Sequence, residues 1–230
     1  MEIVIFFGVL VLSYLIGSIP FGLIIVRLKT GQDIRAVESG RTGGTNVMRA
    51  AGLTSGVATA ILDALKAFVC VYIARYLAPG NYWLAVIAPV AAVIGHNYPI
   101  FLLSRDNKGR LQIGGGAGGA PSVGGATGLW FPMFLIILPI SGLILYFVGY
   151  ASLATLSVPL ICIVVFAYRA WIGVGPWEYV SYGVLTGIVL IWALRPNIKR
   201  LIAGNERLIG FRAKRRERHA KIKQKGGQPG

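Results

Sequence analysis

The sequence predicts an all-α, polytopic integral membrane protein with about seven transmembrane helical segments, the N-terminus outside and the C-terminus cytoplasmic. Three observations predict this fold class. The 230 residues are 55% hydrophobic and only 13% charged, with a mean hydropathy of +0.68, which is typical of membrane proteins. Apolar runs of about 20 residues, the length that crosses a bilayer as a helix, recur along the chain. Lys and Arg gather in two connections between these runs and in the tail after the last one, and thereby orient the chain.

Five crossing segments follow directly from the apolar runs. The first run is too long for a signal-peptide core and has no basic residues before it, so it is predicted to be a membrane span. The two cysteines, Cys70 and Cys162, lie within apolar runs and are interpreted as buried apolar side chains. The five predicted segments are 3–26, 55–77, 82–103, 151–170 and 179–194.

The remaining apolar run, 117–148, is predicted to cross twice. The basic connections 27–54 and 104–124 and the basic tail must all be cytoplasmic, and one crossing by this run would leave the tail outside. We therefore expect a short, glycine-rich segment at about 117–131, followed by a second segment at 132–148. A glycine-rich backbone at that depth must pack against protein or line a cavity.

Two domains are expected: a membrane-embedded domain, 1–207, and a basic, partly disordered cytoplasmic tail, 208–230. Twelve of the 23 Lys and Arg lie from Arg195 onward, so most of the net charge of +15 follows the last apolar run. This placement indicates contact with anionic lipid headgroups rather than with nucleic acid, and we expect no nucleic-acid partner. The sequence is compatible with a monomer.

A polar, glycine-rich loop, "ESGRTGGTNVMRAAG" (38–52), lies between the first two apolar runs. Its glycines leave backbone N–H groups accessible, and Thr45 and Asn46 are good first residues for the helix that follows. A helix N-terminus attracts anions, and two arginines add guanidinium groups suited to phosphate. An ordinary turn with orienting arginines explains the same residues equally well. The candidate site residues in this loop are Ser39, Gly40, Arg41, Gly43, Thr45, Asn46 and Arg49.

A second polar region, 95–125, contains His96 at the inner end of the third apolar run and the run "GGGAGGAPSVGG". This many glycines indicate close approach of the backbone to a ligand or to another helix. A lone histidine at a helix end is more often a hydrogen-bonding residue than a catalyst. Candidate ligand contacts here are His96, Gly115, Gly116 and Gly118.

Other polar residues lie within or after apolar runs. Asp63 and Lys66 are three residues apart, and we interpret them as a structural ion pair near the cytoplasmic end of their helix. Snorkelling explains the basic residues in 195–206 but not Asn197 and Glu206. The sequence contains no Ser–His–Asp arrangement, metal-ligand cluster or Walker-type loop.

Six stretches in order resemble the bacterial acyl-phosphate:glycerol-3-phosphate acyltransferases, the PlsY family, over about residues 10–207. They are "YLIGSIPFG" (14–22), "ESGRTGGTNVMR" (38–49), "LDALKAF" (62–68), "GHNYPIF" (95–101), "GYASLATL" (149–156) and "NIKRLIAGNE" (197–206). The resemblance also implies seven segments with an outside N-terminus, which agrees with the orientation inferred from the charges.

The resemblance implies an enzyme of phospholipid synthesis in the cell membrane, with its active site at the cytoplasmic face. It would transfer an acyl group from acyl phosphate to the 1-hydroxyl of glycerol 3-phosphate, giving lysophosphatidate and phosphate, and it implies no metal, acyl-CoA or other cofactor. The implied catalytic residues are Ser39, Arg49 and Asn46. The implied or candidate contacts to substrate are Gly40, Arg41, Gly43, Thr45, His96, Lys108, Gly115, Gly116, Gly118, Asn197 and Glu206.

The chain departs from the family's pattern at several positions. Gly114 and Ala117 stand where the family's glycine-rich loop has lysines, and an insertion containing "SRDNKGR" precedes them. Leu194 replaces a histidine, and Arg41 replaces an asparagine. The cations expected to replace the lysines are Arg41 together with Arg105, Lys108 or Arg110.

Two alternative functions stay open at this point. A paralogue of the same fold could use a different phosphorylated substrate or lack catalysis. A small anion or lipid transporter is the other alternative, but a transporter should show inverted halves and polar groups at mid-bilayer. The polar groups of this sequence gather at one predicted membrane face instead.

Overall fold

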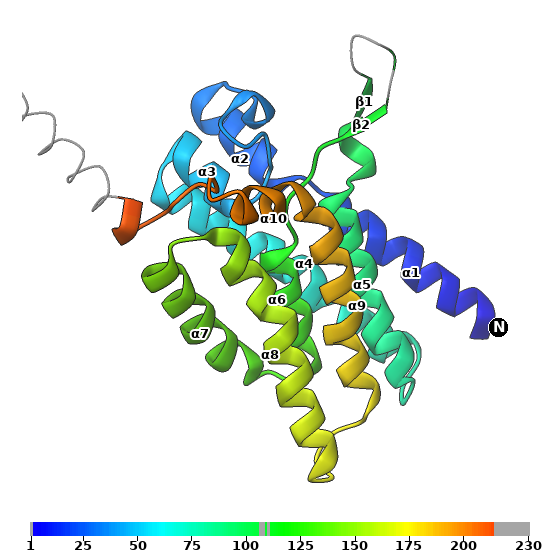
Figure 1. Cartoon of the computed structure of the whole chain (residues 1–230). Helices are drawn as coiled ribbons and strands as arrows, with labels where there is room; N and C mark the ends of the chain where they lie inside the picture. Colours follow the sequence, from blue (N-terminus) through cyan, green and yellow to red (C-terminus); the bar gives the residue numbers. More distant parts are fainter. Residues whose placement is uncertain (1, 106–108, 110, 214–230) are drawn as a thin grey trace, which may run out of the picture.

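Ten α-helices account for most of residues 2–105, 109 and 111–213, which are the residues that the computed structural model describes (Figure 1). They are α1 (Glu2–Ser18), α2 (Phe21–Thr30), α3 (Gly44–Ala51), α4 (Leu53–Leu77), α5 (Tyr82–Asn97), α6 (Gly119–Leu129), α7 (Met133–Val148), α8 (Ala151–Trp171), α9 (Glu178–Ala193) and α10 (Arg195–Ile202). Two 3₁₀ helices, η1 (Ile34–Ala36) and η2 (Ile100–Leu102), lie between them.

The described helices agree with the predicted crossing segments to within a few residues from α4 onward. The run 117–148 is divided into α6 and α7, as predicted, and the chain turns between Trp130 and Pro132. Among the described residues, four helical stretches are long and apolar enough to cross a membrane: Glu2–Thr30, Leu53–Leu77, Tyr82–Leu102 and Ala151–Trp171. A fifth is added when α9 and α10, which meet at 69°, are taken together. The protein is therefore a multi-pass helical membrane protein.

Two features of the fold differ from the sequence-based expectation. The predicted first span, 3–26, is broken after Ser18, because Pro20 has no N–H group with which to continue the helix. A short antiparallel hairpin, β1 (Leu103–Arg105) and β2 (Leu111–Ile113), follows η2 and pairs Leu103 with Ile113. Its strands of three residues are too short to give a period-two pattern in the sequence.

Small residues bring the helices of the bundle into close contact. A side chain at Gly124 of α6 would collide with the backbone of Ala64 in α4, and one at Gly17 of α1 would collide with Ala92 in α5. Small residues at helix crossings are the usual means by which membrane helices approach one another closely. The glycines of α6 therefore fix this short helix against α4.

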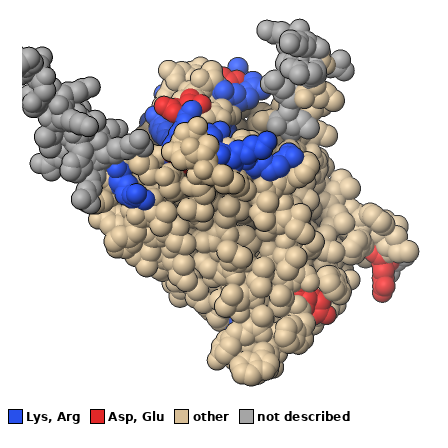
Figure 2. Space-filling view, viewed as in Figure 1, with Lys and Arg blue, Asp and Glu red and all other residues tan. Residues whose placement is uncertain are grey.

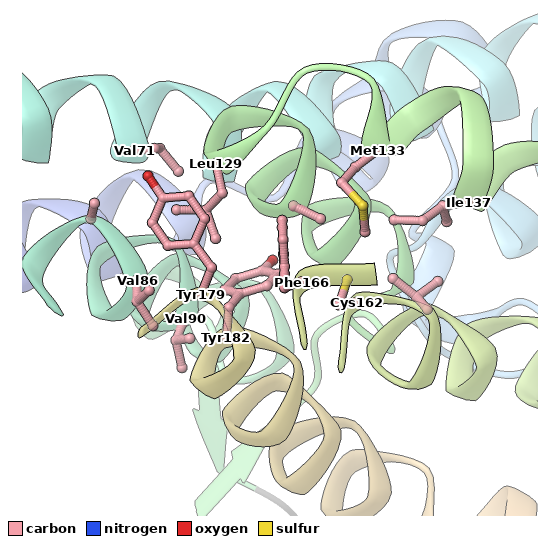
Figure 3. Packing of buried hydrophobic residues seen from close by; sticks show 13 residues of the cluster. Val71, Val86, Val90, Leu129, Met133, Ile137, Cys162, Phe166, Tyr179 and Tyr182 are labelled. Carbon is pink, nitrogen blue, oxygen red and sulfur yellow. The ribbon is translucent and has the colours of Figure 1, made fainter. Parts of the chain in front are cut away.

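Larger apolar side chains fill the space between α4 and α9 farther along the bundle. Figure 3 shows Phe166, Tyr179 and Tyr182 packed together in this cluster, with Met133 and Ile137 of α7 beside them. Tyr182 is fully buried, and its hydroxyl donates a hydrogen bond of 2.8 Å to the carbonyl oxygen of Ser122 in α6. This core and the hydrogen bond from Tyr182 hold α6 within the bundle.

Two cations of α4 satisfy the ends of neighbouring helices. Lys66 Nζ donates to the carbonyl oxygens of Gly17 and Ile19, both at 2.9 Å, where α1 breaks. Arg75 donates to the carbonyl oxygens of Gly128 and Leu129, at 2.9 and 2.8 Å, at the end of α6. Helix ends leave carbonyl groups without intrahelical partners, and these bonds replace those partners inside the bundle.

Lys and Arg side chains gather at one end of the molecule. Figure 2 shows them at the upper end of the face in view, and Figure 1 places α2, α3 and α10 at that end. We call the part formed by the described residues of 19–52, 97–105, 111–119, 149–152 and 193–213 the basic end. The opposite part, formed by 75–82, 128–133 and 169–179, is the far end.

Candidate functional site

The loop 38–46 is held in shape by Asn46, the third residue of α3. Its amide nitrogen donates to the carbonyl oxygens of Val37 at 3.0 Å and Arg41 at 2.9 Å, and its amide oxygen accepts from the N–H of Ser39 at 3.5 Å. Asn46 is 3% exposed. Gly40 adopts a φ of +66°, which glycine reaches without strain. The amide of Asn46 is thus engaged with its own loop, which leaves Ser39 and Thr45 at the surface of the loop.

The glycine run lies between this loop and the end of α5. The N–H of Gly116 donates to the carbonyl oxygen of His96 at 3.0 Å, and the N–H of Thr42 donates to Gly115 at 3.5 Å. A Cβ atom at Gly116 would collide with the imidazole of His96, and one at Gly115 would collide with the His96 carbonyl. Gly115 and Gly116 are therefore needed for close packing, and Gly118 then turns the chain into α6 with a φ of +84°.

The corner between α9 and α10 forms the third part of the site. Glu206 is 7% exposed and accepts from Asn197 Nδ2 at 2.8 Å and from Arg200 Nε at 2.9 Å. Arg41 connects all three parts of the site. It donates to the carbonyl oxygen of Ala193 at 2.8 Å, to Asn197 Oδ1 at 3.2 Å and to the carbonyl oxygen of Gly116 at 3.4 Å.

A cavity of about 510 Å³ opens between these three parts at the basic end. Of the residues predicted from the sequence, those that line it are Ser39, Arg41, Gly43, Thr45, Asn46, Arg49, His96, Gly118, Asn197 and Glu206. Gly40, Gly115 and Gly116 are not among the lining residues, because they shape the backbone behind the wall. Lys108 and Arg110 lie outside the described residues.

Four described helices begin at the wall of this cavity. The lining residues near their N-termini are Gly44 and Thr45 of α3, Gly119 and Ala120 of α6, Ala151 and Ser152 of α8, and Pro196 and Asn197 of α10. No side chain of the described residues caps any of these four N-termini by a hydrogen bond. The free N–H groups and the positive ends of the helix dipoles make the cavity attractive to anions.

Four arginines line the cavity, and their partners differ. Arg200 is paired with the buried Glu206, and Arg207 is paired with Glu38 at 2.8 Å. Burial, and to a smaller degree Arg200, lowers the pKa of Arg41 from its usual value, although an arginine stays charged near neutral pH. Arg49 is exposed and has no hydrogen-bond or ion-pair partner among the described residues. Its guanidinium is therefore available to a ligand.

The predicted ion pair between Asp63 and Lys66 is present at the cavity wall, where Asp63 is a lining residue, with Lys66 Nζ 2.8 Å from Asp63 Oδ1. His96 Nδ1 lies 3.4 Å from the same carboxylate oxygen and 3.2 Å from Lys66 Nζ. Because Lys66 also holds the end of α1, the pair links the break in the first span to the cavity wall. Within the described residues, no group of three or more His, Cys, Asp or Glu side chains could hold a metal ion.

Sequence reasoning missed several residues of the cavity wall. Ser152 and Thr155 come from the first turns of α8, and the hydroxyl of Ser152 is buried without a hydrogen-bond partner among the described residues. The stretch "GYASLATL" gave a signal for this part of the wall. Glu38 and Arg207 were missed because nothing in the sequence indicates that these two residues, 169 positions apart, form an ion pair.

The chain matches a family model described as glycerol-3-phosphate acyltransferase over residues 7–204. A glycerol-3-phosphate acyltransferase from Gloeobacter violaceus is 34% identical over 209 residues, covering 88% of this chain and 94% of the relative. One from Bradyrhizobium diazoefficiens is 37% identical over 204 residues, covering 89% of this chain and 95% of the relative.

Solved structures of similar fold point to the same family. The crystal structure of PlsY, an integral membrane glycerol 3-phosphate acyltransferase, in its glycerol 3-phosphate form has a TM-score of 0.74 and 31% sequence identity. The match covers 89% of this chain and 96% of that protein. The lysophosphatidic acid form of PlsY has a TM-score of 0.71 and 30% identity, covering 89% of this chain and 95% of that protein.

Proposed function

Given that this chain is an acyltransferase of the glycerol-3-phosphate acyltransferase family, we propose that it transfers an acyl group from acyl phosphate to the 1-hydroxyl of glycerol 3-phosphate. The products are lysophosphatidate and inorganic phosphate. The observation that carries this proposal is the cavity at which four uncapped helix N-termini and four arginines meet. Two phosphorylated substrates repel each other, so a shared site must supply both positive charge and N–H donors.

In the proposed reaction, the 1-hydroxyl oxygen attacks the carbonyl carbon of acyl phosphate. The bond between that carbon and the phosphate oxygen breaks, and the phosphate group leaves with the bonding electrons. The hydroxyl proton passes to a phosphate oxygen of a substrate, so that an ester and hydrogen phosphate result. This route requires no protein base, and the protein acts by positioning and by electrostatic stabilisation.

The contacts of each side chain support different roles around this reaction. Arg49 is the proposed phosphate ligand, because its guanidinium has no competing partner among the described residues. Ser39 and Thr45 line the cavity beside the N-terminus of α3 and are proposed to bind phosphate or the acceptor hydroxyl. Asn46 is proposed to act by holding this loop in place, since its amide donates to Val37 and Arg41.

Arg41 is proposed to supply the positive charge that, in the family this chain resembles, comes from basic side chains at other positions. Its guanidinium donates to Gly116 and to Ala193, the residues beside Ala117 and Leu194. In the pattern of the family that this chain resembles, a lysine stands at the position of Ala117 and a histidine at the position of Leu194. This chain lacks both of these basic residues. Asn197, which accepts from Arg41 and donates to Glu206, is proposed to contact glycerol 3-phosphate.

The same proposal includes an orientation in the cell membrane. We place the basic end at the cytoplasmic face, because Lys and Arg are enriched in cytoplasmic connections. With α6 and α7 each counted as a segment, the chain has seven segments, an outside N-terminus and a cytoplasmic C-terminus. The tail, of which only residues up to 213 are described, is proposed to contact anionic lipid headgroups.

A second candidate function keeps the fold and changes the substrate. In its favour, Gly114, Ala117 and Leu194 stand at positions where the pattern of the family that this chain resembles has basic residues. Such a paralogue would transfer an acyl group to another phosphorylated polyol, or would bind without catalysis. The cavity at one end of the bundle gives no support to a transporter.

The proposal is tested by purifying the protein in detergent and measuring phosphate release from palmitoyl phosphate. We expect release that depends on glycerol 3-phosphate and that is lost in Arg49→Ala but retained in Arg35→Gln, whose ion pair with Asp33 lies outside the cavity. Release that is independent of glycerol 3-phosphate, or that responds only to another phosphorylated polyol, would favour the second candidate.

A further inference from the structure

An ion pair crosses the rim of the cavity and joins two segments that are distant in the sequence. Arg207 Nη1 lies 2.8 Å from Glu38 Oε2, and both residues line the cavity. The two side chains are 49% and 52% exposed, so the pair is in contact with water. It connects the loop 38–46 with the irregular segment 203–210 that follows α10.

The backbone on either side of Arg207 is held by bonds that do not involve Glu38. Glu206 is buried and accepts from Asn197 and Arg200. On the other side, the N–H of Ile209 donates to the carbonyl oxygen of Gly149 at 2.8 Å. The backbone of Arg207 is therefore held near the rim by bonds that are independent of its ion pair, and the guanidinium stays within reach of the cavity.

The backbone of Glu38 has an unusual conformation. Its φ is +48°, and it is the one residue other than glycine with a positive φ in the described part of the chain. This conformation is unfavourable for a side chain that is neither Asn nor Asp, and strained residues of this kind cluster at ligand-binding sites. It places a carboxylate at the rim of a cavity that otherwise attracts anions.

The four arginines of the cavity differ in how easily they can change partners. Arg41 and Arg200 donate to part-buried carbonyl and carboxylate oxygens within the protein. Arg207 has one exposed carboxylate partner, and exposed ion pairs contribute little because water screens them. Glu38 accepts one hydrogen bond from Arg207. A phosphate dianion carries more negative charge than a carboxylate and can accept two parallel hydrogen bonds from a guanidinium, so it is the better partner.

We propose that Arg207 binds the phosphate of the water-soluble substrate and that Glu38 is its counter-ion in the empty cavity. Binding of the substrate then replaces the Arg207–Glu38 ion pair with an Arg207–phosphate pair. The identity of this substrate as glycerol 3-phosphate rests on the proposed function. We assign Arg207 to the water-soluble substrate rather than to acyl phosphate, because the Arg207–Glu38 pair is exposed to water. Acyl phosphate is a lipid and reaches the cavity from the bilayer.

The first test compares Michaelis constants at saturating palmitoyl phosphate. Arg207→Gln should raise KM for glycerol 3-phosphate about tenfold, because one charge-assisted hydrogen bond to the substrate is lost. The value of kcat should change less than about twofold. Glu38→Gln should lower this KM by about two- to threefold, because the phosphate no longer displaces a carboxylate. Arg207→Lys should recover part of the loss. The matched control is Arg35→Gln, which removes an exposed ion pair outside the cavity and should leave KM unchanged.

Three results would overturn the assignment. Arg207→Gln could give the same KM as Arg35→Gln. Arg207→Gln and Glu38→Gln could raise KM equally and lower the melting temperature, which would show that the pair only supports the fold. A change confined to KM for palmitoyl phosphate would assign Arg207 to the other substrate.

A second readout separates this inference from the proposed function. Glycerol 3-phosphate should raise the melting temperature of the detergent-solubilised wild type more than that of Arg207→Gln. If the wild type shows this protection but transfers no acyl group, the proposed reaction is wrong and the assignment of Arg207 stands. If the wild type is active while Arg207→Gln has an unchanged KM and unchanged protection, the assignment alone is wrong.

Discussion

Arginines at the two ends of the bundle have different partners. At the far end, Arg75 donates to the carbonyl oxygens of Gly128 and Leu129 and to the hydroxyl of Tyr179 at 2.7 Å. Also at that end, Arg169 stacks on Trp130, with its Cζ atom 3.9 Å from the ring centroid. At the basic end, Arg49 has no partner among the described residues.

The difference follows from which helix ends surround each arginine. Helix C-termini expose carbonyl oxygens, which accept from a guanidinium, so Arg75 is bound by the fold itself. Helix N-termini expose N–H groups, which cannot accept from an arginine, so they give Arg49 no partner. Arg41, at the same end, instead donates to the carbonyl oxygens of Gly116 and Ala193. The same type of side chain therefore stabilises the fold at one end and is left free for a ligand at the other.

The largest expected effect is the loss of activity in Arg49→Ala. The value of kcat/KM should fall about 10²- to 10³-fold, as when a preorganised contact to a reacting group is removed. The melting temperature should stay unchanged, because no hydrogen bond within the described residues is lost. Steady-state kinetics and a thermal melt in detergent check this, and Arg49→Lys should recover part of the activity. An Arg49→Ala enzyme with nearly normal kcat/KM would remove Arg49 from the site.

The next largest effect is a loss of stability in Arg75→Met, at the far end of the bundle. This change leaves two carbonyl oxygens at the end of α6 unpaired, so the free energy of unfolding should fall by about 2–4 kcal/mol. The folded fraction should keep its KM for glycerol 3-phosphate, because Arg75 does not line the cavity. Equilibrium unfolding in detergent measures the first quantity and initial rates the second. A raised KM with normal stability would contradict the division between the two ends.

A smaller effect is expected from Gly116→Ala, which tests the wall of the cavity. A Cβ atom at this position collides with the imidazole of His96 and should displace the glycine run, lowering kcat/KM about tenfold. The control is Gly114→Ala, where the added atom meets nothing within 4 Å. Equal activity of the two variants would show that the close packing of Gly116 is not needed for the site.

The smallest effect is expected at Asp33, on the surface of the basic end. The hydrogen bond from Arg35 lowers the pKa of the Asp33 carboxyl. A lowered pKa in the folded state means that the pair adds stability above the ordinary pKa and loses it as the pH falls through the lowered value. Because the pair is exposed, Asp33→Asn should cost less than about 0.5 kcal/mol near pH 7. Thermal melts at pH 7 and pH 3 should show this small difference becoming smaller at the lower pH.

Much of the fold follows from the sequence, because apolar length and the placement of basic residues are properties of single segments. The division of 117–148 into α6 and α7 was predicted from the orientation of the basic connections. The break after Ser18 and the hairpin at 103–113 were not predicted. The break is stabilised by Lys66, a residue of another helix, and the strands are too short to leave a pattern.

The candidate site was predicted in part. Residues such as Ser39, Arg49 and Asn197, which the sequence singles out one segment at a time, line one cavity. The sequence could not predict which of these side chains already have hydrogen-bond or ion-pair partners within the protein. The amide of Asn46 is engaged with its own loop, and the partner of Arg207 lies 169 residues away. Such pairings depend on the packing of distant segments.

The most direct test of the central claim, that the cavity at the basic end brings acyl phosphate and glycerol 3-phosphate together, is product analysis by mass spectrometry. The purified protein is given palmitoyl phosphate and ¹³C-labelled glycerol 3-phosphate. We expect labelled palmitoyl lysophosphatidate in an amount equal to the phosphate released, and its loss in Arg49→Ala. Phosphate release accompanied by free palmitate, with no labelled lipid, would contradict it.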